Sequence, residues 1–184
     1  TITLSNGTNS LVAGSGLDTI TAASGTNTID AGDDADVITL SGGNNTLSAG
    51  SGNDSITATG GTNTIETDSG NNTVVLNDGT NSVTAGTGAD TITAAGGLNT
   101  ITAGDGNDTV ILSNGINSVV AGVGTDTIDA VNGTNRIDAG DDADVISLSG
   151  GNNTVLGGSG ADSITASNGS NVIDAGTEND TITA

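Results

Sequence analysis

The chain has 184 residues, with no aromatic residue, proline, cysteine, methionine or histidine, and Arg136 is its only basic side chain. A formal net charge of −21 excludes nucleic acid as a partner, because that binding needs lysine and arginine to neutralise phosphates, and an anionic membrane surface would also repel the chain. The lack of cysteine excludes disulfides and cysteine-based zinc sites, and no apolar run reaches the length that membrane insertion requires.

An 18-residue period runs through the whole chain. The stretch Ala13-Gly14-Ser15-Gly16-Leu17-Asp18-Thr19-Ile20-Thr21 returns as AGSGNDSIT at 49–57 and as AGTENDTIT at 175–183. Between its copies lie related nine-residue units such as AASGTNTID at 22–30, whose turn ends on Gly-x-Asn instead of Gly-x-Asp. Such a period is typical of a solenoid. Residues 1–184 are therefore predicted to form a single domain of ten 18-residue coils, followed by the stub 181–184; coil one is 1–18, coil two 19–36, and so on.

Each half of a coil begins with a short alternating run and ends in a glycine-rich turn. In coil one these halves are residues 1–9 and 10–18. Alternation with period two between Gly, Asn and Asp predicts strands and turns, and no segment has helical periodicity. The prediction is an all-β, right-handed parallel β-roll or β-solenoid of about ten coils, with two short strands per coil stacked about 4.8 Å apart.

Alternation also predicts which side chains point inward. The first strand of each coil contributes Ile2, Ile20, Ile38, Ile56, Val74, Ile92, Val110, Ile128, Ile146 and Ile164. The second contributes Leu11, Ile29, Leu47, Ile65, Val83, Ile101, Val119, Ile137, Val155 and Ile173. Two residues after the first set, leucine and alanine alternate coil by coil from Leu4 and Ala22 onward, as layers do when they interdigitate.

Aspartates at the end of each coil share one phase, which we call the Asp ladder. Its members are Asp18, Asp36, Asp54, Asp90, Asp108, Asp126, Asp144, Asp162 and Asp180, interrupted only by Asn72. Neighbouring carboxylates about 5 Å apart would repel by about 1–3 kcal/mol, and no lysine is present to neutralise them. A divalent cation between turns would neutralise these carboxylates, and ligands that are all oxygen favour Ca²⁺ over Mg²⁺. The alternative is a solvated acidic edge that only aids solubility.

The Asp-containing nonapeptide resembles the RTX (repeats-in-toxin) motif G-G-x-G-x-D-x-U-x, whose members form a calcium-loaded parallel β-roll. The resemblance implies Ca²⁺ as a cofactor, several ions along one edge, with ligands from the Asp ladder and the glycine turns. The implied turn ligands are Gly14, Gly16, Gly50, Gly52, Gly86, Gly88, Gly104 and Gly106. This chain departs from the motif in three ways. Alanine replaces the first glycine in most coils, Asp34, Asp142 and Glu178 replace a later one, and coil four has lost its aspartate.

The other edge carries an unbroken row of asparagines, the Asn ladder. Its members are Asn9, Asn27, Asn45, Asn63, Asn81, Asn99, Asn117, Asn135, Asn153 and Asn171. A neutral amide cannot balance Ca²⁺, but it can donate and accept along a stack. We therefore predict a structural ladder there, with calcium on the opposite edge only.

The outward face of the first strands is rich in Thr-x-Thr. The candidate face comprises Thr1, Thr3, Thr19, Thr21, Thr39, Thr57, Thr91 and Thr93. It resembles the ice-binding face of β-solenoid antifreeze proteins, with departures at Val75, Ile111, Asp129 and Ser147. The alternative is that threonine is simply a good exposed strand residue.

These features together predict a structural protein and not an enzyme. The chain has no histidine, cysteine or lysine, and a row of equivalent carboxylates does not separate an acid from a base. The expected function is a secreted, extracellular calcium-binding segment of an adhesin, surface layer or fibre that folds on binding Ca²⁺. Ice binding is the alternative, and a non-catalytic module of a secreted enzyme a weaker one. Uncapped ends predict pairing end to end with a second copy or with flanking domains.

Overall fold

The computed structural model describes residues 1–184 as two parallel β-sheets with no helix. The 11-stranded sheet contains β1 (Ile2–Leu4), β3 (Thr19–Ala22), β5 (Val37–Leu40), β7 (Ser55–Ala58), β9 (Thr73–Leu76), β11 (Thr91–Ala94), β13 (Thr109–Leu112), β15 (Thr127–Ala130), β17 (Val145–Leu148), β19 (Ser163–Ala166) and β21 (Thr181–Thr183). The 10-stranded sheet contains β2 (Thr8–Val12), β4 (Thr26–Asp33), β6 (Asn44–Ser51), β8 (Thr62–Glu66), β10 (Thr80–Thr87), β12 (Leu98–Asp105), β14 (Ile116–Val123), β16 (Thr134–Asp141), β18 (Asn152–Ser159) and β20 (Ser170–Asp174).

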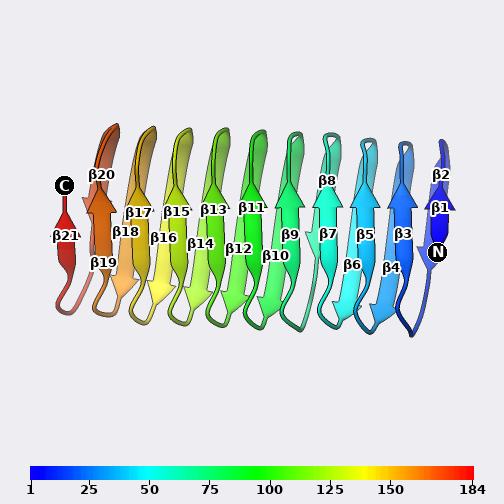
Figure 1. The fold of residues 1–184 in the computed structure, drawn as a ribbon, viewed down its shortest axis with the longest axis horizontal. Coiled ribbons are helices and arrows are strands. Elements are labelled where there is room, and N and C mark those ends of the chain that lie inside the picture. Colours follow the sequence, from blue (N-terminus) through cyan, green and yellow to red (C-terminus); the bar gives the residue numbers. More distant parts are fainter.

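Every strand pairs in parallel with the equivalent strand one coil away. Ile20 lies between Ile2 and Ile38, and the same offset of eighteen residues holds along both sheets. In Figure 1 the nearer strands run upward, the fainter strands run downward, and the chain advances from right to left. This path is a right-handed screw, the hand that parallel crossover connections favour. The predicted parallel solenoid with 18 residues per coil is confirmed.

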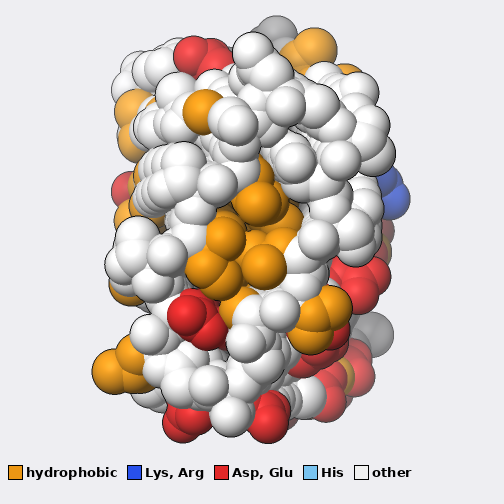
Figure 2. Space-filling model, turned by 90° about the vertical axis from the view of Figure 1, so that its right-hand side faces the viewer, with side chains coloured by type: hydrophobic (Ala, Val, Ile, Leu, Met, Phe, Trp, Pro, Cys, Tyr) orange, Lys and Arg blue, Asp and Glu red, His pale blue; other side chains and the backbone are white.

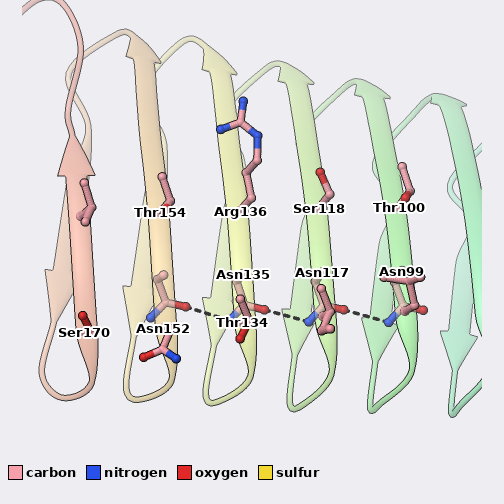
Figure 3. A pocket seen from close by; sticks show the side chains of 14 residues that line it. Asn99, Thr100, Asn117, Ser118, Thr134, Asn135, Arg136, Asn152, Thr154 and Ser170 are labelled. Atoms are coloured by element: carbon pink, nitrogen blue, oxygen red, sulfur yellow. Dashed lines mark hydrogen bonds between the residues drawn. The ribbon is translucent and has the colours of Figure 1, made fainter.

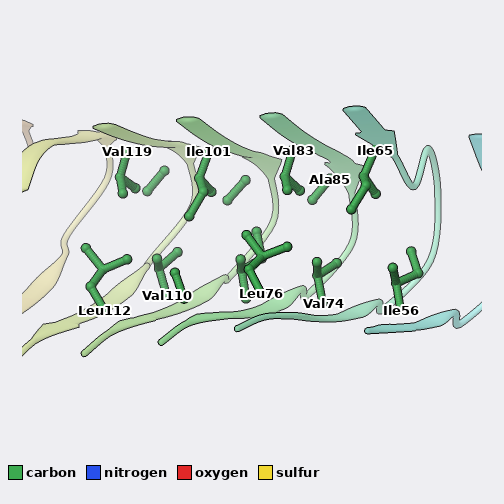
Figure 4. Close-up of a cluster of buried hydrophobic side chains, with 14 of the residues drawn as sticks. Ile56, Ile65, Val74, Leu76, Val83, Ala85, Ile101, Val110, Leu112 and Val119 are labelled. Carbon is green, nitrogen blue, oxygen red and sulfur yellow. The ribbon is translucent and has the colours of Figure 1, made fainter. Parts of the chain in front are cut away.

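The core lies between the two sheets as one continuous cluster of 32 buried residues. The residues predicted to point inward are buried in coils two to nine. Figure 4 shows Leu76 and Leu112 reaching from one sheet toward Val83, Ile101 and Val119 of the other. Ala94 pairs with Leu76 on one side and with Leu112 on the other, so that large and small side chains alternate along the stack. This interdigitation is how aliphatic residues alone fill the core.

The second strand of most inner coils is longer than the sequence pattern indicated. β4, β6, β10, β12, β14, β16 and β18 each have eight residues, because the strand continues through the Ala-Gly segment. Ala31 is fully buried there and forms part of the core. Gly32 has a φ of 106°, and a Cβ at that position would overlap the carbonyl oxygen of Gly14 in the preceding coil. Glycine is therefore required where successive strands approach so closely.

Both ends of the solenoid leave the core and the sheet edges uncovered. Figure 2 looks along the axis at the N-terminal end, where apolar side chains are visible in the centre. Ile2, Leu4 and Leu11 are only partly buried in that first coil, and Ile182 at the other end is 50% exposed. The fold contains no helix that is long and apolar enough to cross a membrane.

Candidate metal centre

The end of the second strand and the short turn after it, positions 13 to 18 of each coil, place the Asp ladder inside the edge of the solenoid. One carboxylate oxygen, Oδ1, accepts a hydrogen bond from the backbone N–H of the corresponding residue one coil earlier. Asp126 Oδ1, for example, accepts from Asp108 N at 2.7 Å, and Asp144 Oδ1 accepts from Asp126 N at 2.8 Å. The same bond links every consecutive pair from Asp18 to Asp180, passing through Asn72 in coil four.

These carboxylates are buried, which contradicts the alternative of a solvated acidic edge. Seven of the nine ladder aspartates are no more than 1% exposed, and Asp18 and Asp180 in the outermost turns are partly buried. The acidic residues that do lie in solvent on this edge are Asp33, Asp34, Asp68, Asp105, Asp141, Asp142 and Glu178. The edge thus carries an inner row of dry carboxylates and an outer, hydrated set.

The second oxygen, Oδ2, of each buried ladder carboxylate has no partner. This holds for Asp36, Asp54, Asp90, Asp108, Asp126, Asp144 and Asp162. Leaving a buried charge unpaired costs about 3–5 kcal/mol. Seven such groups together would exceed the total stability of an ordinary domain, about 5–15 kcal/mol. The row therefore requires protons or cations.

Burial raises the pKa values of these carboxyl groups, so that they hold a proton more readily. Desolvation is the largest cause, and it raises the pKa of Asp126 to about 6 and that of Asp144 to about 7. The pKa values of Asp36, Asp54 and Asp90 are raised for the same leading reason. The backbone hydrogen bond opposes the shift, and neighbouring carboxylates such as Asp108 beside Asp126 add to it.

The glycine turns supply further oxygen atoms, and the two predicted glycine positions differ. The carbonyl oxygen of Gly14 accepts from Asp33 N at 3.0 Å and that of Gly50 accepts from Ser69 N at 3.5 Å, while Gly86 and Gly104 lie within paired strands. No hydrogen bond of the turns ends on the carbonyl oxygens of Gly16, Gly52, Gly88 or Gly106. The later glycine of the turn is therefore the one with a free ligand atom.

The donor set fits a hard cation. No three acidic side chains gather at one point, so a bound ion would need backbone oxygens beside the Asp ladder. The available donors are Oδ2 atoms and free carbonyl oxygens, without nitrogen or sulfur, and a site with many oxygens suits Ca²⁺ better than Mg²⁺.

Three of the predicted departures from glycine place a side chain on strained backbone. Asp34, Asp142 and Glu178 have φ values of 79°, 80° and 80°, in the left-handed region that favours glycine. Asp68 of coil four also has a positive φ, 59°. The turn conformation is thus kept where glycine has been lost.

The opposite edge is closed by hydrogen bonds alone, and the Asn ladder is confirmed. Asn99 Nδ2 donates to Asn117 Oδ1 at 2.8 Å (Figure 3). It also donates to the carbonyl oxygen of Gly96, in the turn before its strand, at 2.9 Å. The amide-to-amide bond repeats without a gap from Asn9 to Asn171. Each inner asparagine is buried with its polar atoms satisfied, so this edge has no need of an ion.

The threonine-rich face lies on the outer side of the 11-stranded sheet. Thr3, Thr21, Thr39 and Thr57 follow one another in register, and Val75 ends this column. Thr1 and Thr19 are exposed, and Thr91 and Thr93 are partly buried.

Sequence reasoning missed Thr67, which is fully buried in the turn of coil four. The available signal was its position, because alanine or glycine stands there in all the other coils. Its hydroxyl accepts a hydrogen bond from Asn72 Nδ2 at 3.1 Å.

No curated protein matches the chain. The family model for the RTX calcium-binding nonapeptide repeat matches residues 4–38, 40–74, 76–110, 111–146 and 147–182, nearly the whole sequence. The chain belongs to the RTX calcium-binding nonapeptide repeat family.

Proposed function

We propose that this chain is a non-catalytic structural rod whose folding depends on calcium held along the Asp edge. The observation that carries the proposal is the row of seven buried carboxylate oxygens without a partner. The Asp ladder, together with the free carbonyl oxygens of the later turn glycines, would hold the ions. Bound Ca²⁺ would supply the positive charge that a chain with one basic residue lacks.

Coupling of folding to binding follows from the same row. Without cations the ladder carboxylates repel one another and lose their hydration on folding, so the unfolded chain is favoured where calcium is scarce. A calcium-rich exterior would favour the folded rod. This dependence supports a secreted segment of an adhesin, surface layer or fibre.

The two ends supply the natural contacts of such a rod. The edges of β1, β2, β20 and β21 leave backbone groups available to a further strand. A second copy of the chain or flanking domains would continue the sheets there, and the continuous core supports treating residues 1–184 as one domain.

A calcium titration followed by far-UV circular dichroism tests the proposal. Starting from a sample stripped with EDTA, Ca²⁺ should convert a coil spectrum into a β spectrum, and Mg²⁺ at the same concentration should not. A β spectrum that EDTA leaves unchanged would contradict calcium-dependent folding.

Ice binding by the outer face of the 11-stranded sheet is the second candidate. The in-register column Thr3, Thr21, Thr39 and Thr57 favours it, since a regular array of hydroxyls and methyls on a flat sheet can match an ordered surface. The parent should then inhibit ice recrystallisation, and the Thr39→Tyr/Thr57→Tyr variant should not. An inactive parent would leave the threonines as ordinary strand residues.

A further inference from the structure

Coil four, residues 55–72, differs from the other coils by a matched pair of substitutions at the Asp edge. Asn72 replaces the ladder aspartate, and Thr67 replaces the small residue five positions earlier. Thr67 is fully buried and Asn72 is 1% exposed, so both side chains lie inside the turn. β8 also ends at Glu66, whereas the equivalent strands of the neighbouring coils continue for three more residues.

The pair satisfies all of its own polar atoms. Asn72 Oδ1 accepts from Asp54 N at 2.9 Å, as a ladder carboxylate would. Asn72 Nδ2 donates to Thr67 Oγ1 and to the carbonyl oxygen of Gly70, both at 3.1 Å. Thr67 Oγ1 in turn donates to the carbonyl oxygen of Ala85 in coil five at 2.7 Å. No buried atom of either side chain is left without a partner.

In the coils that carry aspartate, the same position lacks part of this hydrogen bonding. There the atom equivalent to Asn72 Nδ2 is a carboxylate Oδ2, which can only accept. In coils five and six the corresponding carbonyls, Gly88 and Gly106, receive no hydrogen bond in the turns, whereas the Gly70 carbonyl receives one from Asn72. The amide and hydroxyl hydrogens of coil four therefore stand where the other coils require a cation.

We propose that coil four is an ion-free link in which Thr67 and Asn72 replace the cation with hydrogen bonds. This inference rests on the proposed calcium edge. It divides that edge into two separate rows of ions, one along Asp18, Asp36 and Asp54 and the other along the six ladder aspartates from Asp90 to Asp180. A chain in which every coil binds calcium would instead carry a single uninterrupted row.

The test is to restore the common residues at both positions and to count ions. The Thr67→Ala/Asn72→Asp variant should bind at least one more Ca²⁺ per chain than the parent, measured by equilibrium dialysis and calorimetric titration. Asp68→Gly is the matched control, because it restores the usual glycine in the same turn and removes an exposed carboxylate. Its ion count should equal that of the parent.

Calcium anomalous scattering from crystals of the parent provides a second readout that needs no variant. Peaks should line the Asp edge on both sides of coil four, with none at Asn72. An ion at Asn72, an unchanged count in the double variant, or a lower count in Asp68→Gly would overturn the ion-free link while leaving the calcium edge intact. Failure of the parent to bind any Ca²⁺ would overturn the proposed function and this inference with it.

Discussion

At the scale of single residues, the two edges of the solenoid differ by the chemistry of one side-chain atom. Asn99, near the start of β12, and Asp108, in a turn, are both buried, and both link to the preceding coil through Oδ1. The second atom is a donor in asparagine and an acceptor in aspartate. The amide edge therefore closes without help, and the carboxylate edge requires a cation or a proton.

Breaking the Asn ladder should destabilise the fold without changing calcium binding. Asn99→Leu removes the partners of Asn81 Nδ2, Asn117 Oδ1 and the Gly96 carbonyl. Each buried polar group left unsatisfied costs about 1–3 kcal/mol, so we expect a loss of at least about 3 kcal/mol.

Urea denaturation in saturating Ca²⁺ measures this loss, and dialysis measures the ion count. Thr100→Ala, at the exposed neighbouring position, is the control and should change stability by less than about 0.5 kcal/mol. Equal effects of the two substitutions, or a lower ion count in Asn99→Leu, would contradict the structural role of the ladder.

The sequence predicts both ladders because an unbroken phase of eighteen residues places equivalent side chains on top of one another. It does not predict that the ladder carboxylates are dry. Alternation of small and charged residues in the turn is compatible with either direction of the Asp126 side chain, and only the path of the turn backbone decides that its Oδ1 meets the Asp108 amide. Thr67 was missed for a different reason. Threonine is common throughout the chain, so one more threonine did not stand out.

At the scale of the strands, the alternation of leucine and alanine determines how successive layers fit. Leu76 and Ala94 are fully buried, and they pair directly across β9 and β11. Leu76→Ala should destabilise the protein by about 2–5 kcal/mol, because it leaves a cavity beside an already small neighbour.

The exchange Leu76→Ala/Ala94→Leu should not recover this loss in full. It conserves total volume, but it brings the introduced leucine against Leu112 and the introduced alanine against Ala58. Thermal denaturation in Ca²⁺ should therefore rank the parent above both variants. A double variant as stable as the parent would show that the core tolerates any order of large and small layers.

Strand faces are predictable here, whereas strand lengths are not. Residues such as Ile101 and Val119 alternate with polar neighbours, so their inward direction follows from period two. The Ala-Gly segment that extends β12 to Asp105 has no such contrast, and glycine normally indicates a turn. Close stacking of Gly104 on Gly86 converts that segment into strand.

At the scale of the whole molecule, protons should substitute in part for calcium. The raised pKa values of Asp126, about 6, and Asp144, about 7, exceed the ordinary aspartate value of 3.8. A group whose pKa is raised on folding stabilises the fold fully below its unfolded pKa, and this contribution is lost as the pH rises through the folded value. In EDTA, stability should therefore fall between about pH 4 and pH 8.

The folded fraction of the protein in EDTA, measured by far-UV circular dichroism at about pH 4.5 and about pH 8, tests this difference. The Asp126→Asn/Asp144→Asn variant should show a smaller pH dependence than the parent, because two of the titrating groups are gone. Saturating Ca²⁺ should flatten the profile near neutral pH. Metal-free protein that is more stable at the higher pH than at the lower one would contradict the burial of uncompensated carboxylates.

The alternation of leucine and alanine layers has a consequence for folding errors. Because the repeat is eighteen residues long, a strand could pair with the strand two coils away and keep the same register. Backbone hydrogen bonds alone therefore do not discriminate against this misfolded pairing. Skipping one coil, however, brings two leucine layers or two alanine layers together. Skipping two coils restores the order but expels two whole coils from the stack. The alternation of leucine and alanine layers thus disfavours register errors of one coil, which the repeated sequence would otherwise allow.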